Sequence, residues 1–325
     1  MALIDTDARR AQSRRAFLGA LAAAAGSLVT SGVAWGQDRS RVVLVRHHGL
    51  DSILNTFHYQ KILDMLTEAI ELLTGETSPG TARRKFFGIN DNLGVQIAAH
   101  PVGVVPEVVD AVCTTAARAG VSPDRMFIYS ADERELFKAG FGIKREGPGV
   151  RCYGARSEGY RDSVSKLVLP HVTAIANVPC LSPHPVVGLS GALHNFVNSV
   201  TLERQHEAYI SGGERLPAVL SKNALQTRIR LHVMDCVRPA YDIPETGKPK
   251  RWAYDGLIVS TDPVAIDAVG TAILEAKRRE IAGADWPLDP SPIHVEAAAT
   301  RFDLGTSDLN QIEILRIGPM DDALI

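Results

Sequence analysis

The sequence alternates short β-branched runs with stretches of helical apolar spacing, and this alternation constrains the fold more than any other feature. Residues 41–46 form the run Arg-Val-Val-Leu-Val-Arg, which is typical of a buried strand. From Tyr59 to Leu73 apolar residues recur every three or four positions, as on one face of a helix. Because helices that link parallel strands cover the sheet, we expect an α/β fold with a mostly parallel, doubly wound sheet and helices on both faces.

The same patterns predict the remaining elements. Further strands are expected at residues 85–89, 126–129, 172–178, 229–234, 257–260 and 312–317, and further helices at residues 106–119, 132–139, 189–200 and 263–275. Hydrophobic residues make up 45% of the 325 residues, which is enough for a large core and excludes a disordered chain. We expect a single α/β domain over residues 37–325, with a small lobe at residues 140–165 or 200–250.

The N-terminal 36 residues have the composition of a signal peptide, so they are not part of the predicted domain. Ser13-Arg14-Arg15-Ala16-Phe17-Leu18 is similar to the core of a bacterial twin-arginine signal, and an uncharged run follows it up to Ala34. The run is rich in Ala and Gly, so it is a weak candidate for a membrane anchor. The sequence therefore predicts a periplasmic protein that the twin-arginine translocase exports, with no stable membrane span after cleavage.

Charge and cysteine content exclude further classes. Removing residues 1–36 takes away four Arg and two Asp, which changes the net charge from −2 to −4. A nucleic-acid partner is not expected, because such proteins usually carry a basic surface. The cysteines are widely spaced without a Cys-x-x-Cys pair, which excludes an iron–sulfur motif and a zinc ribbon. Cys180 and Cys236, which follow predicted strands, are either buried apolar residues or a redox pair.

Polar residues follow several predicted strands, where ligands bind in open parallel sheets. The richest segment runs from residue 177 to 196 and contains His184, His194 and Asn195. A neutral imidazole near pH 7 can transfer a proton or bind a divalent metal, so His184 and His194 are candidates for either role. A small polar molecule is the expected ligand. Its candidate binding residues are Asn92, Ser182, Asp235, Asp262 and His206.

Two carboxylates lie around the start of the helix predicted at residues 263–275. Asp262 precedes Pro263 and is placed to cap the helix. Asp267 lies among apolar residues, so it is either on the polar face of the helix or a buried catalytic carboxylate. The chain has no Gly-x-Gly-x-x-Gly after a strand, no Walker A loop and no Gly-x-Ser-x-Gly. A nucleotide cofactor is therefore not expected, and the fold is expected to be Rossmann-like without a dinucleotide fingerprint.

Four segments of the chain resemble, in order and spacing, the family called domain of unknown function 362 (DUF362). They are Asn177-Val178-Pro179, Ser182-Pro183-His184, Ser190-Gly191-Ala192-Leu193-His194-Asn195, and Ser260-Thr261-Asp262-Pro263-Val264-Ala265-Ile266-Asp267-Ala268. The resemblance extends over about residues 85–275. It implies the family's fold and the position of its site. Asn90, Ser182 and His194 stand where the family pattern usually has Lys, which removes three cations from the site.

These observations lead to three alternative functions. The first is a periplasmic enzyme with a pocket of His184, His194, Asn195 and Asp267, in which the two imidazoles act as acid and base or hold a divalent metal. The second is a non-catalytic periplasmic ligand-binding or accessory protein. The third is a redox partner that uses Cys180 and Cys236.

Overall fold

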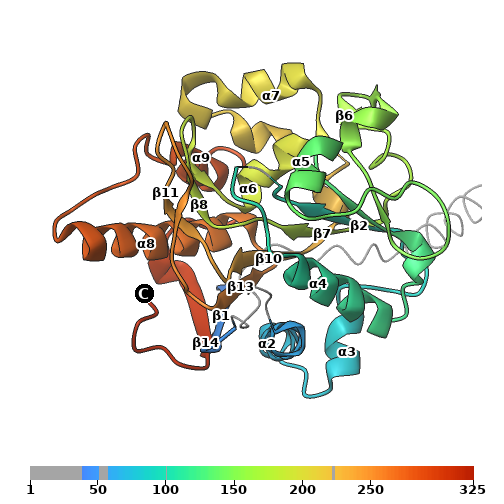
Figure 1. The fold of residues 1–325 in the computed structure, drawn as a ribbon, viewed down its shortest axis with the longest axis horizontal. Helices are drawn as coiled ribbons and strands as arrows, with labels where there is room; N and C mark the ends of the chain where they lie inside the picture. Colours follow the sequence, from blue (N-terminus) through green and yellow to red (C-terminus); the bar gives the residue numbers. More distant parts are fainter. Residues whose placement is uncertain (1–38, 51–57, 100, 222–223) are drawn as a thin grey trace, which may run out of the picture. The chain divides into compact units, whose positions relative to one another are not determined.

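A mixed sheet forms the centre of the computed structural model, which describes residues 39–50, 58–99, 101–221 and 224–325. Its strands are β1 (Ser40–Arg46), β2 (Leu93–Ile97), β3 (Met126–Tyr129), β4 (Arg151–Cys152), β7 (Ala174–Val178), β10 (Ile229–Cys236), β13 (Gly256–Ser260) and β14 (Ile312–Ile317). They lie in the order β14–β1–β13–β10–β7–β2–β3–β4 (Figure 1). The predicted twin-arginine segment lies outside the described residues.

One strand of this sheet runs against all the others. β13 pairs with β1 and with β10 in antiparallel register, whereas every other neighbouring pair is parallel. The predicted mostly parallel α/β fold is confirmed. The reversal of β13 has a consequence for the site, because the carboxyl end of β13 lies at the sheet edge where its neighbours begin.

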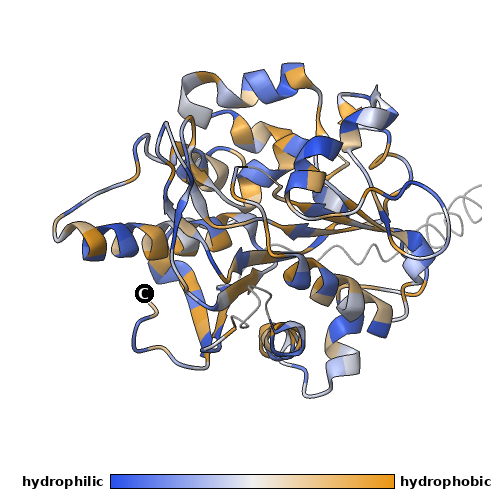
Figure 2. Cartoon of the chain, in the orientation of Figure 1, coloured by the Kyte–Doolittle hydropathy of each residue, from blue (hydrophilic) through white to orange (hydrophobic). Residues whose placement is uncertain are grey.

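Helices cover both faces of the sheet. α2 (Tyr59–Thr74), α3 (Pro79–Arg84) and α4 (Pro106–Arg118) lie on one side, and α6 (Ala192–Asn195), α7 (Leu202–Tyr209), α8 (Pro263–Ala282) and α9 (Ile293–Thr300) lie on the other (Figure 1). Successive strand residues point to opposite faces, so Val43 packs in the core under α2 whereas Leu44 packs in the core under α8. The sheet strands are mainly orange in Figure 2, while α8 carries both orange and blue residues, as expected for a helix with one buried face.

The remaining elements are short. They are α5 (Glu133–Lys138), β5 (Tyr160–Arg161), β6 (Val164–Ser165), β8 (Ser182–His184), β9 (Gly188–Ser190), β11 (Ala240–Asp242) and β12 (Lys250–Arg251), with several single turns of 3-10 helix between them. In the part of the chain that the structure describes, no helix is long and apolar enough to cross a membrane.

The strand predicted at residues 85–89 is wrong, and the true strand is β2. Ile89 is 71% exposed, and the Asp91 carboxylate accepts a hydrogen bond from the Gly88 backbone N–H, which fixes a turn there. β2 was missed because its sequence, Leu-Gly-Val-Gln-Ile, contains Gly94 and Gln96. Gly94 is required by packing, since a Cβ there would lie 3.0 Å from the Tyr129 ring.

The helix predicted at residues 189–200 is also partly wrong. Residues 188–190 form strand β9, which pairs with β8 in a hairpin, and only α6 and one turn of 3-10 helix follow. Gly188 has a φ of +81° and lies against the backbone of Pro290, where a Cβ would come within 2.2 Å of the Pro290 carbonyl oxygen. A helix could not make this close contact, and the contact sets the position of the hairpin.

Asp262 fixes the start of α8, as predicted for a capping residue. Its Oδ1 atom accepts hydrogen bonds from the backbone N–H groups of Val264 (2.8 Å) and Ala265 (2.9 Å). Its Oδ2 atom accepts the hydroxyl of Ser40 and the backbone N–H of Thr306. The carboxylate thus joins the start of β1, the start of α8 and the loop before β14.

We expect the Asp262→Ala substitution to lower the free energy of unfolding by about 2 kcal/mol, the upper end of the range for losing a helix N-cap. The reason is that several buried donors lose their acceptor at once. Urea unfolding of the purified protein measures the effect. Asp308→Ala, which removes the cap of an exposed 3-10 turn, is the matched control and should cost less than about 1 kcal/mol. Equal losses in the two variants would contradict this role of Asp262.

Candidate active site

Three imidazoles and one phenol from four different elements lie close together. We call His184 (β8), His194 (α6), Tyr209 (α7) and His294 (α9) the imidazole cluster. The ring centroids of His184 and His194 are 4.3 Å apart, and the Tyr209 ring is 5.7 Å from the first and 5.8 Å from the second. His294 is near enough for its charge to lower the pKa of His194. The two histidines predicted as catalytic are therefore brought together.

The β8–β9 hairpin and the start of α6 hold the first two imidazoles in place. In the hairpin Ser182 is paired with Ser190 and His184 with Gly188. The contact between Gly188 and Pro290 places the hairpin against the segment just before α9, which carries His294. His194 follows within a few residues, on the first turn of α6. Local chain geometry thus joins two histidines, and one tertiary contact adds the third.

The hydrogen bonds assign a proton position to the neutral ring of His184 and connect both nitrogens of His194 to hydroxyl groups. The backbone N–H groups of Val186 and Val187 donate to Nδ1 of His184 at 3.2 and 3.3 Å, so the proton of His184 lies on Nε2. For His194, Nε2 is 2.9 Å from the Tyr209 hydroxyl and Nδ1 is 3.4 Å from the Ser190 hydroxyl. Since each hydroxyl can donate or accept, both neutral tautomers of His194 fit these contacts.

Burial keeps the cluster uncharged at neutral pH. It lowers the pKa of His184 to about 4. It also lowers the pKa of His194 well below its usual value, and the neighbouring His184 and His294 lower it further. Burial raises the pKa of Tyr209 to about 12. These groups are therefore neutral hydrogen-bond donors and acceptors near pH 7, and an anion bound among them would favour the protonated imidazoles.

Ser182 adds a polar group with no protein partner. Its side chain is 1% exposed, and its Oγ atom makes no hydrogen bond to any described residue. Ser182 lies directly across the hairpin from Ser190, and it is on the same side of β8 as His184, two residues away. A buried hydroxyl without a partner usually costs free energy, so a ligand atom at this position would gain a ready hydrogen bond.

Asp267 is fully buried and holds the start of α6. Its Oδ1 accepts the backbone N–H of Ala192 at 2.5 Å and its Oδ2 accepts that of Leu193 at 2.9 Å. A Cβ on Gly191 would lie 2.2 Å from Oδ1, so only glycine permits this approach. Burial raises the pKa of Asp267 to about 7, against the effect of these two hydrogen bonds. Of the two alternatives for this residue, the structure shows the buried carboxylate, and its contacts position the helix of His194.

Asn195 points into the core, away from the imidazoles. Its amide donates to Oδ1 of Asn177 at 2.7 Å, and its backbone carbonyl accepts a hydrogen bond from Gln96. Asn177 in turn donates to the carbonyl of Ala192 and lies 3.0 Å from Nδ1 of His232. This buried network ties α6 to β2, β7 and β10. Asn195 therefore belongs to the support of the cluster and not to its lining.

The structure places Asp235 on the other face of the sheet from the cluster. Its carboxylate accepts the backbone N–H groups of Val105 (2.6 Å) and Val237 (2.8 Å), just before α4 and just after β10. Burial raises the pKa of Asp235 to about 6. Cys180 and Cys236 lie close by as free, buried thiols, and burial raises the pKa of each well above its usual value. Neither the carboxylate nor the thiols reach the imidazoles.

Three other predicted ligand residues also lie apart from the cluster. Asn92 precedes β2, at the amino edge of the sheet, because the strand predicted before it does not exist. Asp262 is at that same edge, because β13 is reversed. His206 is exposed on α7. Tyr209 and His294 were missed, although an isolated His at the start of an apolar helix was a signal that could have drawn attention to position 294.

The chemistry available to the cluster is proton transfer and hydrogen bonding. Among the residues with a described position, no group of three or more His, Cys, Asp or Glu side chains is arranged to hold a metal ion. His184 and His194 would supply two ligands, and further ligands would have to come from water or substrate. The Nε2–H group of neutral His184 can instead donate to a substrate oxygen, and His194 can exchange a proton with Tyr209.

Together these features define an α/β protein with a histidine-lined site beside its central sheet. The family model of DUF362, a domain of unknown function, matches residues 89–272, which is more than half of the chain. The chain belongs to this family, as its motifs predicted. No curated protein matches the sequence. A crystal structure of a protein from Thermotoga maritima is similar to 64% of this chain, with a TM-score of 0.39 and 14% identity, and the chain covers 56% of that protein.

His294 should make the stability of the protein depend on pH. It is fully buried, and burial lowers its pKa from 6.5 to about 4, with the Val187 backbone acting in the opposite direction. As pH falls from 7 to 4, the unfolded chain binds the proton first, so the folded state loses up to about 3 kcal/mol of stability from this residue. Between pH 7 and pH 4 we expect the free energy of unfolding to decrease less in His294→Leu than in the unsubstituted protein. Urea unfolding at a series of pH values measures the difference.

His58→Leu, at an exposed histidine before α2, is the control and should keep the pH dependence of the unsubstituted protein. If His294→Leu showed the same pH dependence of stability as the unsubstituted protein, His294 would not be held neutral by burial.

Proposed function

We propose that this protein is an exported, periplasmic enzyme that binds a small polar substrate at the imidazole cluster and transfers a proton there. The observation that carries the proposal is the convergence of His184, His194, His294 and Tyr209 from four elements into one uncharged group. Burying one imidazole fully and two others in part costs hydration without an evident gain in stability. Such costs are concentrated at functional sites.

Each residue has a role that follows from its contacts. His184 donates from Nε2 to an oxygen of the substrate, because its Nδ1 is occupied by backbone donors. His194 exchanges the proton, since Tyr209 and Ser190 connect both of its nitrogens to other hydroxyls. An oxygen that gains negative charge during the reaction raises the pKa of both rings, which drives the proton toward it. Asp267 is a positioning residue that acts through α6.

A second role for the same rings is a divalent metal held by His184 and His194. The short distance between the rings favours it, and the lack of a third side-chain ligand among the described residues weighs against it. Elemental analysis of protein purified without chelator distinguishes the two roles. A stoichiometric metal that disappears in His184→Ala would establish the metal role.

A non-catalytic ligand-binding protein is the second candidate function. It is favoured by His194, which stands where the family pattern usually has Lys, because an imidazole of such low pKa is a weaker cation than an ammonium group. In this case the cluster and the hydroxyl of Ser182 bind a small molecule without converting it.

Turnover by the cluster is tested with a periplasmic small-molecule extract. We expect the purified protein to consume or produce at least one compound, detected by mass spectrometry. His194→Gln should slow the conversion at least about a hundredfold, the scale of losing a general acid or base, and Tyr209→Phe should slow it less. His58→Gln is the matched control, because this exposed histidine lies outside the cluster.

The outcomes separate the two functions. Conversion that depends on His194 supports the enzyme. A compound that raises the melting temperature without being converted, and fails to do so in His194→Gln, supports the binding protein. If no compound in the extract is bound or converted, or if His194→Gln behaves like His58→Gln, the imidazole cluster is not the functional site.

Export is tested with the full-length chain in bacterial cells. We expect Arg14→Lys combined with Arg15→Lys to retain the protein in the cytoplasm, because the paired arginines are the part of the signal that the translocase reads. Fractionation and immunoblotting measure the distribution. Arg9→Lys with Arg10→Lys is the matched control and should leave export unchanged. Export of both variants to the same extent would contradict the signal.

A further inference from the structure

A cavity lies at the opposite edge of the sheet from the imidazole cluster. It has a volume of about 450 Å³, and we call it the amino-edge pocket. Asn92 before β2 and His171 before β7 line it, whereas the hairpin of His184 follows the carboxyl end of β7. β7 has five residues, so roughly 17 Å of strand separates the two edges. The pocket is therefore a separate site from the one proposed above.

Basic side chains in this pocket outnumber acidic ones. Arg151, Lys166 and His171 line it together with one carboxylate, Glu158. Neither Arg151 nor Lys166 forms an ion pair with a carboxylate in the part of the chain that the structure describes. Arg151 and Lys166 thus line one cavity together with a single carboxylate, that of Glu158.

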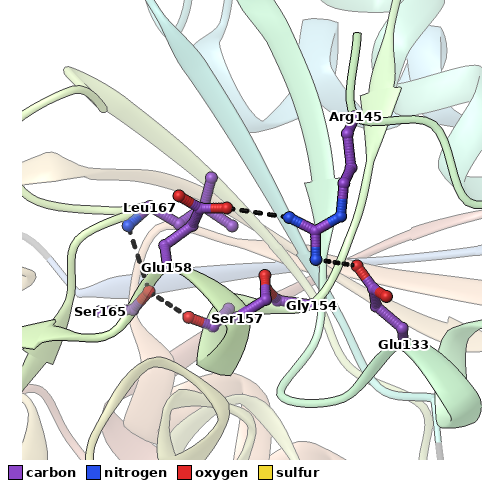
Figure 3. A network of polar contacts seen from close by, with 8 residues as sticks. Glu133, Arg145, Gly154, Ser157, Glu158, Ser165 and Leu167 are labelled. Atoms are coloured by element: carbon purple, nitrogen blue, oxygen red, sulfur yellow. Dashed lines mark hydrogen bonds and ion pairs between the residues drawn. The ribbon is translucent and has the colours of Figure 1, made fainter.

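The carboxylate of Glu158 is already engaged elsewhere. Arg145 contacts Glu158 at 3.0 Å and Glu133 at 2.6 Å, so its guanidinium lies between the two carboxylates (Figure 3). The Arg145 guanidinium also lies 5.3 Å from the ring of Tyr153, which is a wall of the pocket. This arrangement directs Glu158 toward Arg145 and leaves the charge of Arg151 free for a ligand.

Arg151 is held in place without having its hydrogen bonds satisfied. Its guanidinium lies 5.7 Å from the Phe127 ring, which fixes its orientation. Its Nε atom is buried and makes no hydrogen bond to a described residue. A buried donor without an acceptor is costly, and no hydrogen bond of Nε to a described residue holds the Arg151 side chain in place.

We propose that the amino-edge pocket binds the oxyanion group of a small molecule, a phosphate or a carboxylate. The planar guanidinium of Arg151 matches two oxygens of such a group. Lys166 supplies a second positive charge from the rim, and Asn92 and His171 lie within the same cavity to bind the remaining polar atoms. The cavity is larger than a phosphate ion, so it has room for the rest of a small metabolite.

Calorimetric titration of the purified full-length protein tests this proposal, with inorganic phosphate and acetate as probes at constant ionic strength. We expect one of these anions to bind and to raise the melting temperature. Arg151→Met should weaken its binding at least about tenfold and Lys166→Met about threefold. Lys138→Met removes one charge from an exposed lysine outside the pocket and is the matched control.

The stability of the unliganded variants distinguishes a ligand site from a structural arginine. Arg151→Met loses the contact with the Phe127 ring but no hydrogen bond of Nε, so without anion its melting temperature should fall by no more than about 4 °C. The proposal is overturned if neither anion binds, if Arg151→Met and Lys166→Met bind as the unsubstituted protein does, or if Lys138→Met weakens binding equally. It is also overturned if Arg151→Met lowers the melting temperature by more than this without anion.

Discussion

The candidate active site depends on the two hydrogen bonds that the carboxylate of Asp267 accepts. This carboxylate accepts two backbone N–H groups at the first turn of α6 from within the core, and the absence of a side chain at Gly191 lets it approach. α6 is only four residues long, too short to hold its own position. Asp267 is a residue of α8. The direction of α6 and the position of His194 are therefore set by α8.

A second layer of polar contacts supports the same short helix from the sheet. Asn195 and Asn177 bond to one another, and each also bonds to backbone across the junction between α6 and the strands. Buried networks of this kind are favourable only when nearly all members are satisfied, and they then specify one arrangement. The network thus holds α6, and with it His194, in one position against the sheet.

Because strand β13 is reversed, the polar residues beside the strand ends are divided between the two edges of the sheet. Residues after β7 and β10 reach the carboxyl edge, whereas residues after β13 reach the amino edge with those that precede β2 and β7. Asn92 lines the amino-edge pocket and Asp262 lies at the same edge of the sheet, whereas the imidazole cluster lies at the other edge. The two antiparallel pairings of β13 thus separate Asp262 from the imidazole cluster.

The sequence by itself determined the fold class, most strands and long helices, and the family. These features follow from local patterns, such as the apolar run of β1 and the helical spacing of α2. Such patterns can be recognised without knowing which distant segments are in contact. The sequence also predicted that His184 and His194 share one site, because both lie in the polar segment that follows the strand predicted at residues 172–178. Tertiary structure alone decided that residues 93–97 form a strand around a glycine, that β13 is reversed, and that His294 and Tyr209 join the pair. Each of these depends on packing between segments far apart in the chain, which a local pattern does not encode.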